Sequence, residues 1–548
     1  MAQNDQMNQQ VMFLSDGSKR VLGRDAQRIN ILIAKAVANA VKSTLGPKGM
    51  DKMIVDELGD VTISNDGATI LSEMSIDHPA GKMMVDLAKT QDNEVGDGTT
   101  TAVVLAGGLL GKAEKLLDDG IHPSLIIKGY RMAAKKAAEF FEEISDEIDA
   151  KDKKALKEIA LTSMTGKAAE SAEELADLVV KAVMQVAETE NNATVIDKDM
   201  IKLEKKQGAS LAESEMISGL VIDKEIVHTG MPKKLEKAKI ALIDSALEIK
   251  SPETDTKIQI SDPMQLEAFL DQEEKMLQKM VSRVKDSGAN VIFCQKGIDD
   301  MAQHFLAQEG IMAVRRVKKS DMDALAKATG GKVVSRLEGL SKEHLGTAGM
   351  VSEKKISGDQ MVFVEGCKNP KAVTILIRGG TEHVIDEAER AMVDAIGAVT
   401  SSIKSGKVVS GGGSSEMEVS LKLKDYAKTV GGREQLAIEL FSETLEIIPR
   451  TLAESAGMDA IDALVDLRSK HQGKTGKYMG IDVYKGKVAD MKALKVIEPL
   501  AIKKQAVTSA TEVAEMLLRI DDIVAGTSRS SGPPGGMPPG MGGMDGMM

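Results

Sequence analysis

The hydrophobic pattern of this chain changes twice along its length, and this change constrains the fold more than any other feature. From Gly23 to Leu45, apolar residues recur at every fourth position, which predicts an amphipathic helix ended by Gly46-Pro47. Helical patterns continue to about residue 148 and return after residue 377. Between about residues 221 and 371, short β-rich runs alternate with helical runs, which is an α/β pattern. Because 548 residues exceed one hydrophobic core, we expect about three domains.

Short apolar runs predict the strands. In the α/β region they lie at residues 239–249, 289–294, 312–317 and 332–337, and outside it at 53–55, 61–64 and 373–377. Residues 251–262 are polar, and Asp262-Pro263 then predicts the start of a long amphipathic helix. A polar excursion before such a helix indicates a protruding element. An ordinary surface helix after a long loop is the alternative, and residue patterns alone favour it.

Charge and composition restrict the possible partners. Asp and Glu number 83 against 71 Lys and Arg, so the net charge is −12, which opposes binding to nucleic acid or to anionic membranes.

Cys294 and Cys367 lack CxxC spacing, which indicates a reducing compartment. The first residues lack the apolar core of a signal peptide, and no apolar run is long enough to span a bilayer, so we expect a cytoplasmic protein. Residues 529–548, mostly Gly, Pro and Met, predict a disordered tail, either without a role or acting as a soft apolar brush.

The strongest local chemical signal runs from Gly96 to Thr101, with the sequence GDGTTT before an apolar helical pattern. Glycines allow a tight turn that presents backbone N–H groups, and the start of a helix attracts anions. Asp97 is a hard oxygen ligand suited to Mg²⁺ beside a phosphate. The alternative is a helix capped by one of the threonines after a glycine turn.

Other candidate loops are weak when taken one at a time. These are residues 44–49, residues 65–67 and residues 411–413, all of which are ordinary turn formers. The GKT at residues 473–475 lacks the upstream glycine of a P-loop and predicts an exposed loop. The basic run at residues 315–319 predicts a solvated strand end. The seven histidines show no zinc-ligand spacing.

The spacing of charged residues alone also predicts the environment of Asp394. Asp386, Arg390 and Asp394 lie four residues apart, which predicts a salt-bridged helix face in contact with solvent.

Several long segments, in order, resemble the group II chaperonins, especially those of archaea. The resemblance covers about Gly23 to Ala525 and the Gly-Met-rich tail. The segments that carry it are GRDAQRINI, TLGPKGMDKMIVD, ISNDGATIL, QDNEVGDGTTTAVV, TSMTGK, QKGIDDMAQHFL, SGGGSSEMEV and EMLLRIDDI.

This resemblance implies a multidomain α and α/β chain with the chaperonin fold. Residues 1–150 and 405–528 would form a helical equatorial domain that binds ATP. Residues 151–220 and 370–404 would form a small α/β intermediate hinge domain, and residues 221–369 an α/β apical domain that binds substrate. The helical lid protrusion would lie at about residues 249–276. The pairing of the two outer segments comes from the resemblance alone.

The resemblance also implies roles for individual residues. Asp97 would bind Mg²⁺, Asp66 and Asp394 would position and deprotonate the attacking water, and Lys167 would sense the γ-phosphate. For Asp394, this catalytic role replaces the solvent-exposed, salt-bridged position that its spacing predicts. The further residues that would contact ATP are Thr44, Leu45, Gly46, Pro47, Gly67, Gly98, Thr99, Thr100, Thr101, Gly412 and Glu498, the last two at the nucleoside end.

The implied function is that of an ATP-dependent chaperone. Copies of the chain, or related subunits, would form two stacked rings, usually eightfold, that enclose unfolded protein clients behind a built-in lid. A metabolic ATPase or kinase is one alternative, but it needs a second small-molecule pocket with acid–base residues, and the sequence shows no such cluster. A scaffold ring without hydrolysis is the other, and the presence of Asp66, Asp97 and Asp394 argues against it.

Overall fold

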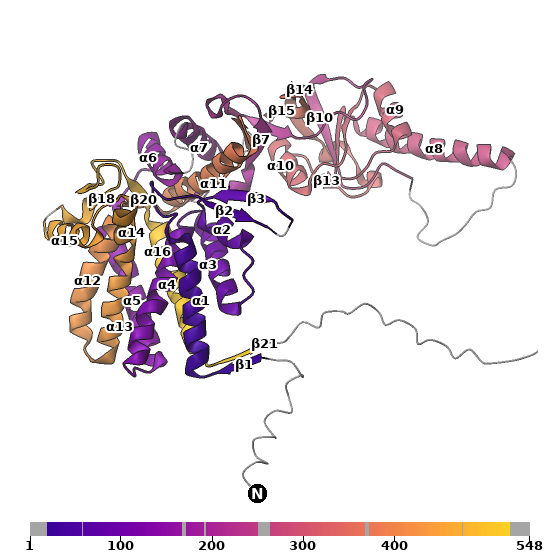
Figure 1. Ribbon diagram of the computed structural model, residues 1–548. Coiled ribbons are helices and arrows are strands. Elements are labelled where there is room, and N and C mark those ends of the chain that lie inside the picture. The colour runs from indigo at the N-terminus through magenta and orange to yellow at the C-terminus, as the bar shows by residue number, and fades with distance from the viewer. Residues whose placement is uncertain are drawn as a thin grey trace, which may run out of the picture.

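The computed structural model describes residues 19–56, 58–166, 171–190, 193–249, 263–367, 372–473 and 475–525. It has a helical body at one end, an α/β body at the other, and a smaller mixed segment between them (Figure 1). The tail from residue 526 onward and Lys167 lie outside the described residues. Among those residues, no helix is long and apolar enough to cross a membrane.

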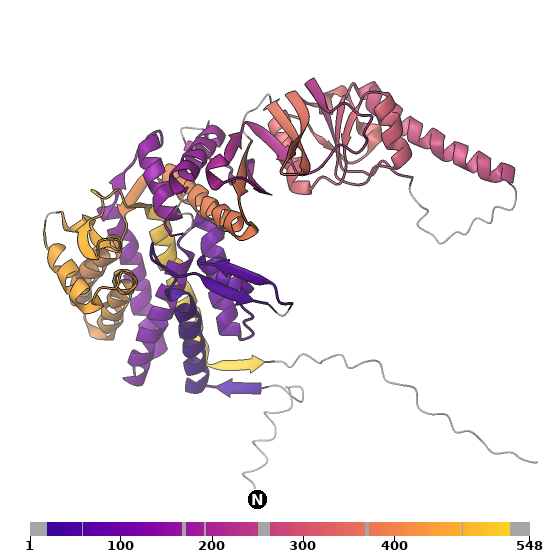
Figure 2. The same ribbon diagram turned by 45° about the horizontal axis from the view of Figure 1, so that its top comes forward.

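The helical body combines the two ends of the chain. Its central helix, α4 (Thr99–Asp118), is apolar on most of its surface, so neighbours cover it on several sides. Strand β1 (Lys19–Leu22) pairs antiparallel with β21 (Asp522–Ala525), and Figure 2 shows this ribbon standing away from the helices. The other helices are α1 (Arg24–Lys42), α2 (Gly67–Glu73), α3 (Pro79–Val95), α5 (Pro123–Ile144), α12 (Ser414–Val430), α13 (Gly432–Leu445), α14 (Ile447–Ser455), α15 (Ala460–Lys470) and α16 (Leu500–Arg519).

One buried cluster joins the early and late helices. It includes Val103 of α4, Phe141 of α5, Phe441 of α13 and Leu517 of α16. Short strands hold the body together at its edges: β2 (Lys52–Val55) with β3 (Val61–Ser64), β4 (Asp146–Glu147) and β20 (Ile497–Pro499) on either side of β17 (Lys407–Ser410), and β18 (Met479–Asp482) with β19 (Lys487–Asp490).

The first helix ends earlier than its sequence predicts. α1 stops at Lys42, not at Gly46-Pro47, so that prediction was wrong by one turn. The Thr44 hydroxyl donates a 2.8 Å hydrogen bond to the Val41 carbonyl, and the Thr44 N–H donates to the same oxygen at 3.0 Å. Threonine thereby competes with the next helical turn for that carbonyl, which ends the helix locally.

The segment between the two bodies contains α6 (Lys153–Met164), α7 (Ala172–Val186) and α11 (Glu382–Ser405). A sheet lies beside them, in which β16 (Val373–Gly379) runs parallel to β7 (Ile201–Gln207) and antiparallel to β8 (Glu215–Ile217). Strands β5 (Glu188–Glu190) and β6 (Ala193–Val195) form a separate ribbon.

The predicted salt-bridged face on α11 is wrong. Asp394 is only 6% exposed, whereas Asp386 pairs with Lys205 at 2.8 Å. Arg390 pairs with Glu387 at 2.9 Å and donates a 3.0 Å hydrogen bond to the Ile63 carbonyl. Spacing places residues on one side of a helix, but the elements packed against that side decide whether it meets solvent.

The α/β body is built on a sheet with strand order β12-β11-β10-β14-β15-β9, and β13 pairs with β10. The run at residues 239–249 is a strand only as far as Ile243, because the chain turns away at Asp244. The elements are β9 (Gly219–Ile222), β10 (Lys234–Ile243), β11 (Val291–Cys294), α9 (Asp300–Gln308), β12 (Met312–Val314), α10 (Lys319–Thr329), β13 (Val333–Val334), β14 (Gly346–Ile356) and β15 (Asp359–Cys367).

The long helix α8 (Pro263–Ser287) begins at the predicted proline and projects from this body (Figures 1 and 2). Its second half is anchored, since Leu277, Val281 and Val284 are buried. Phe269 and Leu270, in its first half, remain 40% and 55% exposed. Of the predicted protrusion at 249–276, residues 250–262 lie outside the described residues.

Candidate functional site

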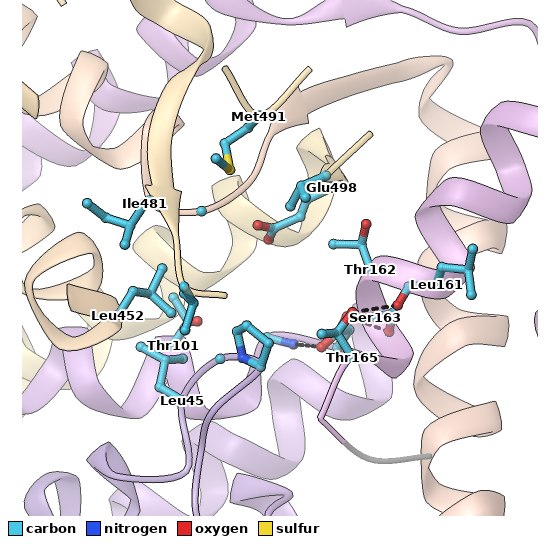
Figure 3. Close-up of a pocket in the computed structure, with 18 of the residues that line it drawn as sticks. Leu45, Thr101, Leu161, Thr162, Ser163, Thr165, Leu452, Ile481, Met491 and Glu498 are labelled. Carbon is cyan, nitrogen blue, oxygen red and sulfur yellow. Dashed lines mark hydrogen bonds between the residues drawn. The ribbon is translucent and has the colours of Figure 1, made fainter. Parts of the chain in front are cut away.

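A cavity of about 790 Å³ lies between the helical body and α6. Turns from distant parts of the chain line it: the turn after α1, the turns before α2 and α4, and the loop that contains Gly412. Figure 3 shows Leu452, Ile481 and Met491 on one side of the cavity, with Thr162 and Ser163 of α6 opposite. The cavity therefore has one mainly apolar end and one polar end.

The polar end is built on the turn that begins α4. Gly98 has a left-handed conformation, with φ of +79°, and a Cβ at this position would lie 2.7 Å from Ile502 Cγ2. Both the dihedral angle and the close approach therefore require glycine here. Gly98 is also the N-cap residue, and no side chain caps the helix, so the alternative of a threonine cap is wrong. The N-terminus of α4 lies at the edge of this cavity, and the N–H groups and dipole of a helix start favour an anionic ligand.

Two carboxylates flank this turn. Asp97 accepts hydrogen bonds from the Gly98 N–H at 2.5 Å and from the Ser163 hydroxyl at 2.8 Å. Asp66 caps α2 through the Thr69 N–H at 2.9 Å and accepts a 3.2 Å hydrogen bond from the Thr99 hydroxyl. Both carboxylates also line the cavity, so each places negative charge beside the start of α4.

The residues present fit a magnesium ion that arrives with a phosphate ligand. Within the described parts of the chain, no group of three or more His, Cys, Asp or Glu side chains forms a ready-made metal cage. Mg²⁺ typically uses one or two protein carboxylates and completes its shell with water and substrate phosphates. Asp97, held rigidly beside the start of α4, supplies such a carboxylate.

The other end of the cavity combines apolar walls with one carboxylate. Leu45, Leu452, Ile481 and Met491 provide the apolar surface, and the Glu498 carboxylate points inward (Figure 3). Burial raises the pKa of Glu498. An apolar slot with a single oriented acid suits a flat, partly polar group such as a nucleoside.

The structure brings most of the predicted site residues together, but not all of them. Gly67 does not line the cavity, because it packs beneath Thr100, where a Cβ would lie 2.6 Å from the Thr100 hydroxyl. Asp394 does not line it either, although its helix touches the turn through Gly397, which lies against Gly96. The predicted residues that do line it are Thr44, Leu45, Gly46, Pro47, Asp66, Asp97, Gly98, Thr99, Thr100, Thr101, Gly412 and Glu498.

Three residues at or beside this cavity were not among the predicted site residues. Ser163 reaches Asp97 from α6. Lys503 and Glu416 lie behind Glu498, where the Lys503 ammonium is 2.5 Å from Glu498 Oε2 and 2.7 Å from Glu416 Oε1. The i, i+5 spacing of residues 498 and 503 is not a recognisable motif, and Glu416 is remote in sequence. The predicted exposed loop is confirmed at Gly473 and Thr475, which lie away from the cavity.

Comparison with known proteins identifies the family. The model of the TCP-1/cpn60 chaperonin family matches residues 37–528. The chain is 61% identical over 518 residues to a thermosome subunit of Methanopyrus kandleri, which covers 94% of this chain and 95% of that protein. The chain belongs to the TCP-1/cpn60 chaperonin family. This chaperonin is also 58% identical over 529 residues to thermosome subunit alpha of Archaeoglobus fulgidus, covering 96% and 97% of the two chains.

Among solved structures, this chaperonin is similar to an open-state monomer of a group II chaperonin from Methanococcoides burtonii. The two share 48% identity with a TM-score of 0.61, over 78% of this chain and all of that one. The similarity confirms the predicted family and fold class, and this chaperonin is of group II.

Proposed function

We propose that the cavity binds ATP with Mg²⁺ and hydrolyses it, and that this drives enclosure of unfolded protein. One observation carries the proposal: the glycine turn at the start of α4, the carboxylates Asp66 and Asp97, and an apolar slot ending at Glu498 all line a single cavity. As a group II chaperonin, the protein is an ATP-dependent molecular chaperone that forms a double-ring chamber.

Each part of the cavity has a task in this proposal. Residues 98–101 and the turn at residues 44–47 bind the phosphates, and Gly412 and Glu498 bind the nucleoside. Asp97 would hold Mg²⁺, which would offset phosphate charge. Asp66, fixed by its hydrogen bonds to Thr69 and Thr99, orients the attacking water.

Asp394 accepts a proton from the water in this mechanism. Asp394 is buried on α11 and does not line the cavity in this conformation, so α11 has to shift toward the cavity before hydrolysis. The contact between Gly397 of α11 and Gly96 offers a pivot for that shift. We also propose Lys167 as the γ-phosphate sensor, at a position outside the described residues.

Three domains transmit the motion in our proposal. Residues 1–150 and 405–528 form the equatorial domain, residues 151–220 and 370–404 the intermediate hinge, and residues 221–369 the apical domain. The contact from Ser163 of α6 to Asp97 supports this arrangement, because it connects the hinge directly to the proposed metal ligand. Closing of the hinge over bound nucleotide then moves the apical domain.

We further propose two stacked rings of about eight copies each, of this chain or of related subunits, working in the cytoplasm. The β1–β21 and β2–β3 ribbons leave strand edges unpaired within the described chain. Met50, Met53 and Val55 on and beside β2 are 71%, 67% and 59% exposed. Such edges and apolar side chains are suited to contacts between subunits.

The first half of α8, with the preceding residues from about 249, serves as the lid. Phe269→Ser with Leu270→Ser removes exposed apolar side chains from this helix without touching its buried anchor. Rings of this double variant should hydrolyse ATP normally but leave a bound unfolded protein open to added protease. Met301→Ser on α9, which replaces a side chain that is 45% exposed, is the control and should protect like the parent. Full protection by the double variant would exclude α8 as the lid.

A phosphate-release assay tests the central activity and separates it from the two alternatives. Rings should release phosphate from ATP, and unfolded protein should change the rate while small metabolites should not. No release at all would favour a scaffold ring, and a rate governed by a small metabolite would favour a metabolic enzyme.

A further inference from the structure

A second cavity, of about 880 Å³, lies among α1, α4, α12, α13, α14 and α15 of the helical body that Figure 1 shows. It shares no described lining residue with the cavity beside Asp97. Helix α14 faces both cavities, the first through Leu452 and the second through Arg450 and Glu454. The second cavity is therefore a separate site, and it has no part in the proposed ATP mechanism.

The charges that line this second cavity are unbalanced. Of the described residues on its lining, seven are Lys or Arg, three are Glu and none is Asp, which leaves a surplus of four positive charges. The whole chain carries a net charge of −12, so this surplus is opposite in sign to the overall charge. A concave surface with one dominant sign of charge concentrates ions of the other sign. We call it the basic cavity.

One buried carboxylate of the basic cavity serves two cations. Glu446 is 5% exposed, its Oε1 is 2.5 Å from the Lys424 ammonium, and its Oε2 pairs with the Arg468 guanidinium. Burial raises the pKa of Glu446, but the hydrogen bonds from Arg468 and Lys424 outweigh burial and lower it. Glu446 is thus one negative charge shared by two positive ones. The Arg468 Nε–H is also buried, and no acceptor in the described part of the chain reaches it.

Glu454 repeats this arrangement on α14. Its Oε2 is 3.0 Å from the Lys42 ammonium and its Oε1 is 3.2 Å from Arg450 Nε. Lys115 of α4 is exposed, and the described parts of the chain offer it no ion-pair partner. A salt-bridged helix surface would balance its charges pair by pair. The two shared carboxylates and Lys115 instead leave positive charge that an anion from outside the chain can neutralise.

Glycines on α4 bring the surrounding helices close enough to enclose the basic cavity. Gly107, Gly108 and Gly111 all line it. A Cβ on Gly107 would lie 2.3 Å from Ala38 Cβ, and a Cβ on Gly108 would lie 2.5 Å from Ile447 Cδ1. The missing side chains therefore let α1 and α14 pack against α4, and this packing gathers the cations of three helices around one space.

We propose that the basic cavity binds a small molecule that carries a chain of phosphoryl groups, such as inorganic tripolyphosphate. A phosphate monoester carries about −1.5 to −2 charges at neutral pH, so two or three linked phosphates match a surplus of four. Arg450 and Arg468 offer planar guanidinium groups that suit phosphate oxygens. Lys42, Lys115 and Lys424 add mobile ammonium groups. The phosphoryl chain belongs either to a free inorganic oligophosphate or to a nucleotide.

The test is calorimetry of assembled rings with tripolyphosphate, in a chelator and with one ADP per chain to fill the cavity beside Asp97. Parent rings should bind one tripolyphosphate per chain. The double variant Lys115→Met with Arg450→Met removes two cations and leaves the buried Glu446 cluster intact. It should weaken tripolyphosphate binding about tenfold or more, the usual effect of losing a hydrogen bond to a charged group. Unchanged binding by this variant would overturn the proposal.

Lys89→Met with Arg433→Met is the matched control. Both side chains are exposed and lie outside the basic cavity, on α3 and α13. This variant loses the same net charge as the double variant and should bind tripolyphosphate like the parent. An equal loss of binding in the control would mean that the overall charge of the chain attracts the anion, which would also overturn the proposal.

Glu443→Gln changes the basic cavity in the opposite direction, and it tests the proposal even if the double variant fails to assemble. Glu443 pairs with Lys112 on the lining, so removal of its charge frees that lysine. Tripolyphosphate should then bind about threefold more tightly, the scale of one exposed ion pair. Weaker binding by Glu443→Gln would contradict the assigned role of the surplus charge.

Titration with ADP alone distinguishes the two sources of phosphate. One ADP per chain, unaffected by Lys115→Met with Arg450→Met, assigns the basic cavity to inorganic oligophosphate. A second, weaker ADP site that this variant removes assigns the cavity to nucleotide phosphates. If dissociated chains bind tripolyphosphate but parent rings do not, another copy of the chain covers the cavity and the proposal is wrong. Absence of binding to both would overturn it as well.

Discussion

The two ends of the cavity are built in different ways. At the end that we propose binds phosphate, called here the phosphate end, short contiguous turns present backbone N–H groups, threonine hydroxyls and the carboxylates Asp66 and Asp97. At the end that we propose binds the nucleoside, called here the nucleoside end, single residues from remote segments meet: Leu452, Ile481, Met491 and Glu498. The first arrangement depends on local backbone geometry and the second on the packing of the whole helical body. We therefore expect substitutions at the phosphate end to change the chemistry and metal binding, and substitutions at the nucleoside end to change affinity alone.

The largest effect should come from Asp394→Ala. If α11 delivers this carboxylate to the attacking water, hydrolysis should fall by about 10²–10⁴-fold, the usual loss for a general base. ATP binding should stay nearly unchanged, because Asp394 does not line the cavity before hydrolysis. Single-turnover phosphate release measures the first effect and equilibrium binding the second.

Asp386→Ala is the control for this variant, since Asp386 lies two turns earlier on the same helix and pairs with Lys205 at the surface. It should hydrolyse ATP within about twofold of the parent. Near-normal hydrolysis by Asp394→Ala would remove Asp394 from the mechanism.

Asp97→Ala should have the next largest effect, and it should depend on the metal. Even residues that only support a metal ligand contribute about 10- to 100-fold to metal affinity, so removing the ligand should weaken Mg·ATP binding by at least that factor. Binding of ATP in the presence of a chelator should change much less. Asp86→Ala, at an exposed position on α3, is the control. If Asp97→Ala weakened ATP binding equally with and without magnesium, the assignment of Asp97 as the metal ligand would be contradicted.

Met491→Ala tests the nucleoside end. Met491 packs against the backbone of Gly412 and Gly480 and faces the cavity, so its loss removes apolar contact from the base. ATP and ADP should both bind about tenfold more weakly, and the maximal hydrolysis rate should not change, because the lost contact is the same before and during the reaction. Met458→Ala, outside the cavity, should leave the affinities unchanged. A lower maximal hydrolysis rate in Met491→Ala would contradict the proposed difference between the phosphate end and the nucleoside end of the cavity.

The smallest effect should come from Ser163→Ala, which removes a hydrogen bond from α6 to Asp97. Loss of a single hydrogen bond to a partly exposed carboxylate should lower hydrolysis about threefold. Ser163→Thr keeps the hydroxyl and should recover the parent rate in the same phosphate-release assay. A decrease of 100-fold or more in the hydrolysis rate would mean that Ser163 takes a direct part in the chemistry.

The same contrast explains what the sequence could predict. Residues 44–47, 65–67 and 96–101 form contiguous turns, so residue chemistry pointed to them, although the resemblance to chaperonins was needed to combine them. The strands at residues 53–55 and 61–64 and the helix start at Pro263 were also readable, because their signals are local. The roles of Asp66, Asp97, Asp394 and Glu498 remain predictions.

Features that depend on tertiary packing could not be predicted from the sequence. The burial of Asp394 depends on the elements that cover α11, and a four-residue spacing carries no information about them. The Glu416–Lys503–Glu498 cluster exists only because α12, α16 and β20 meet in space. The early end of α1 arises from one threonine hydroxyl that competes for a backbone carbonyl.

The most direct test of the central claim is a density map of assembled rings with Mg²⁺ and a slowly hydrolysed ATP analogue. The account predicts phosphate density against residues 98–101, metal density at Asp97, and the sugar and base between Glu498 and Met491. Density for the nucleotide in another cavity, or in this cavity with the base at the turn before α4, would contradict it.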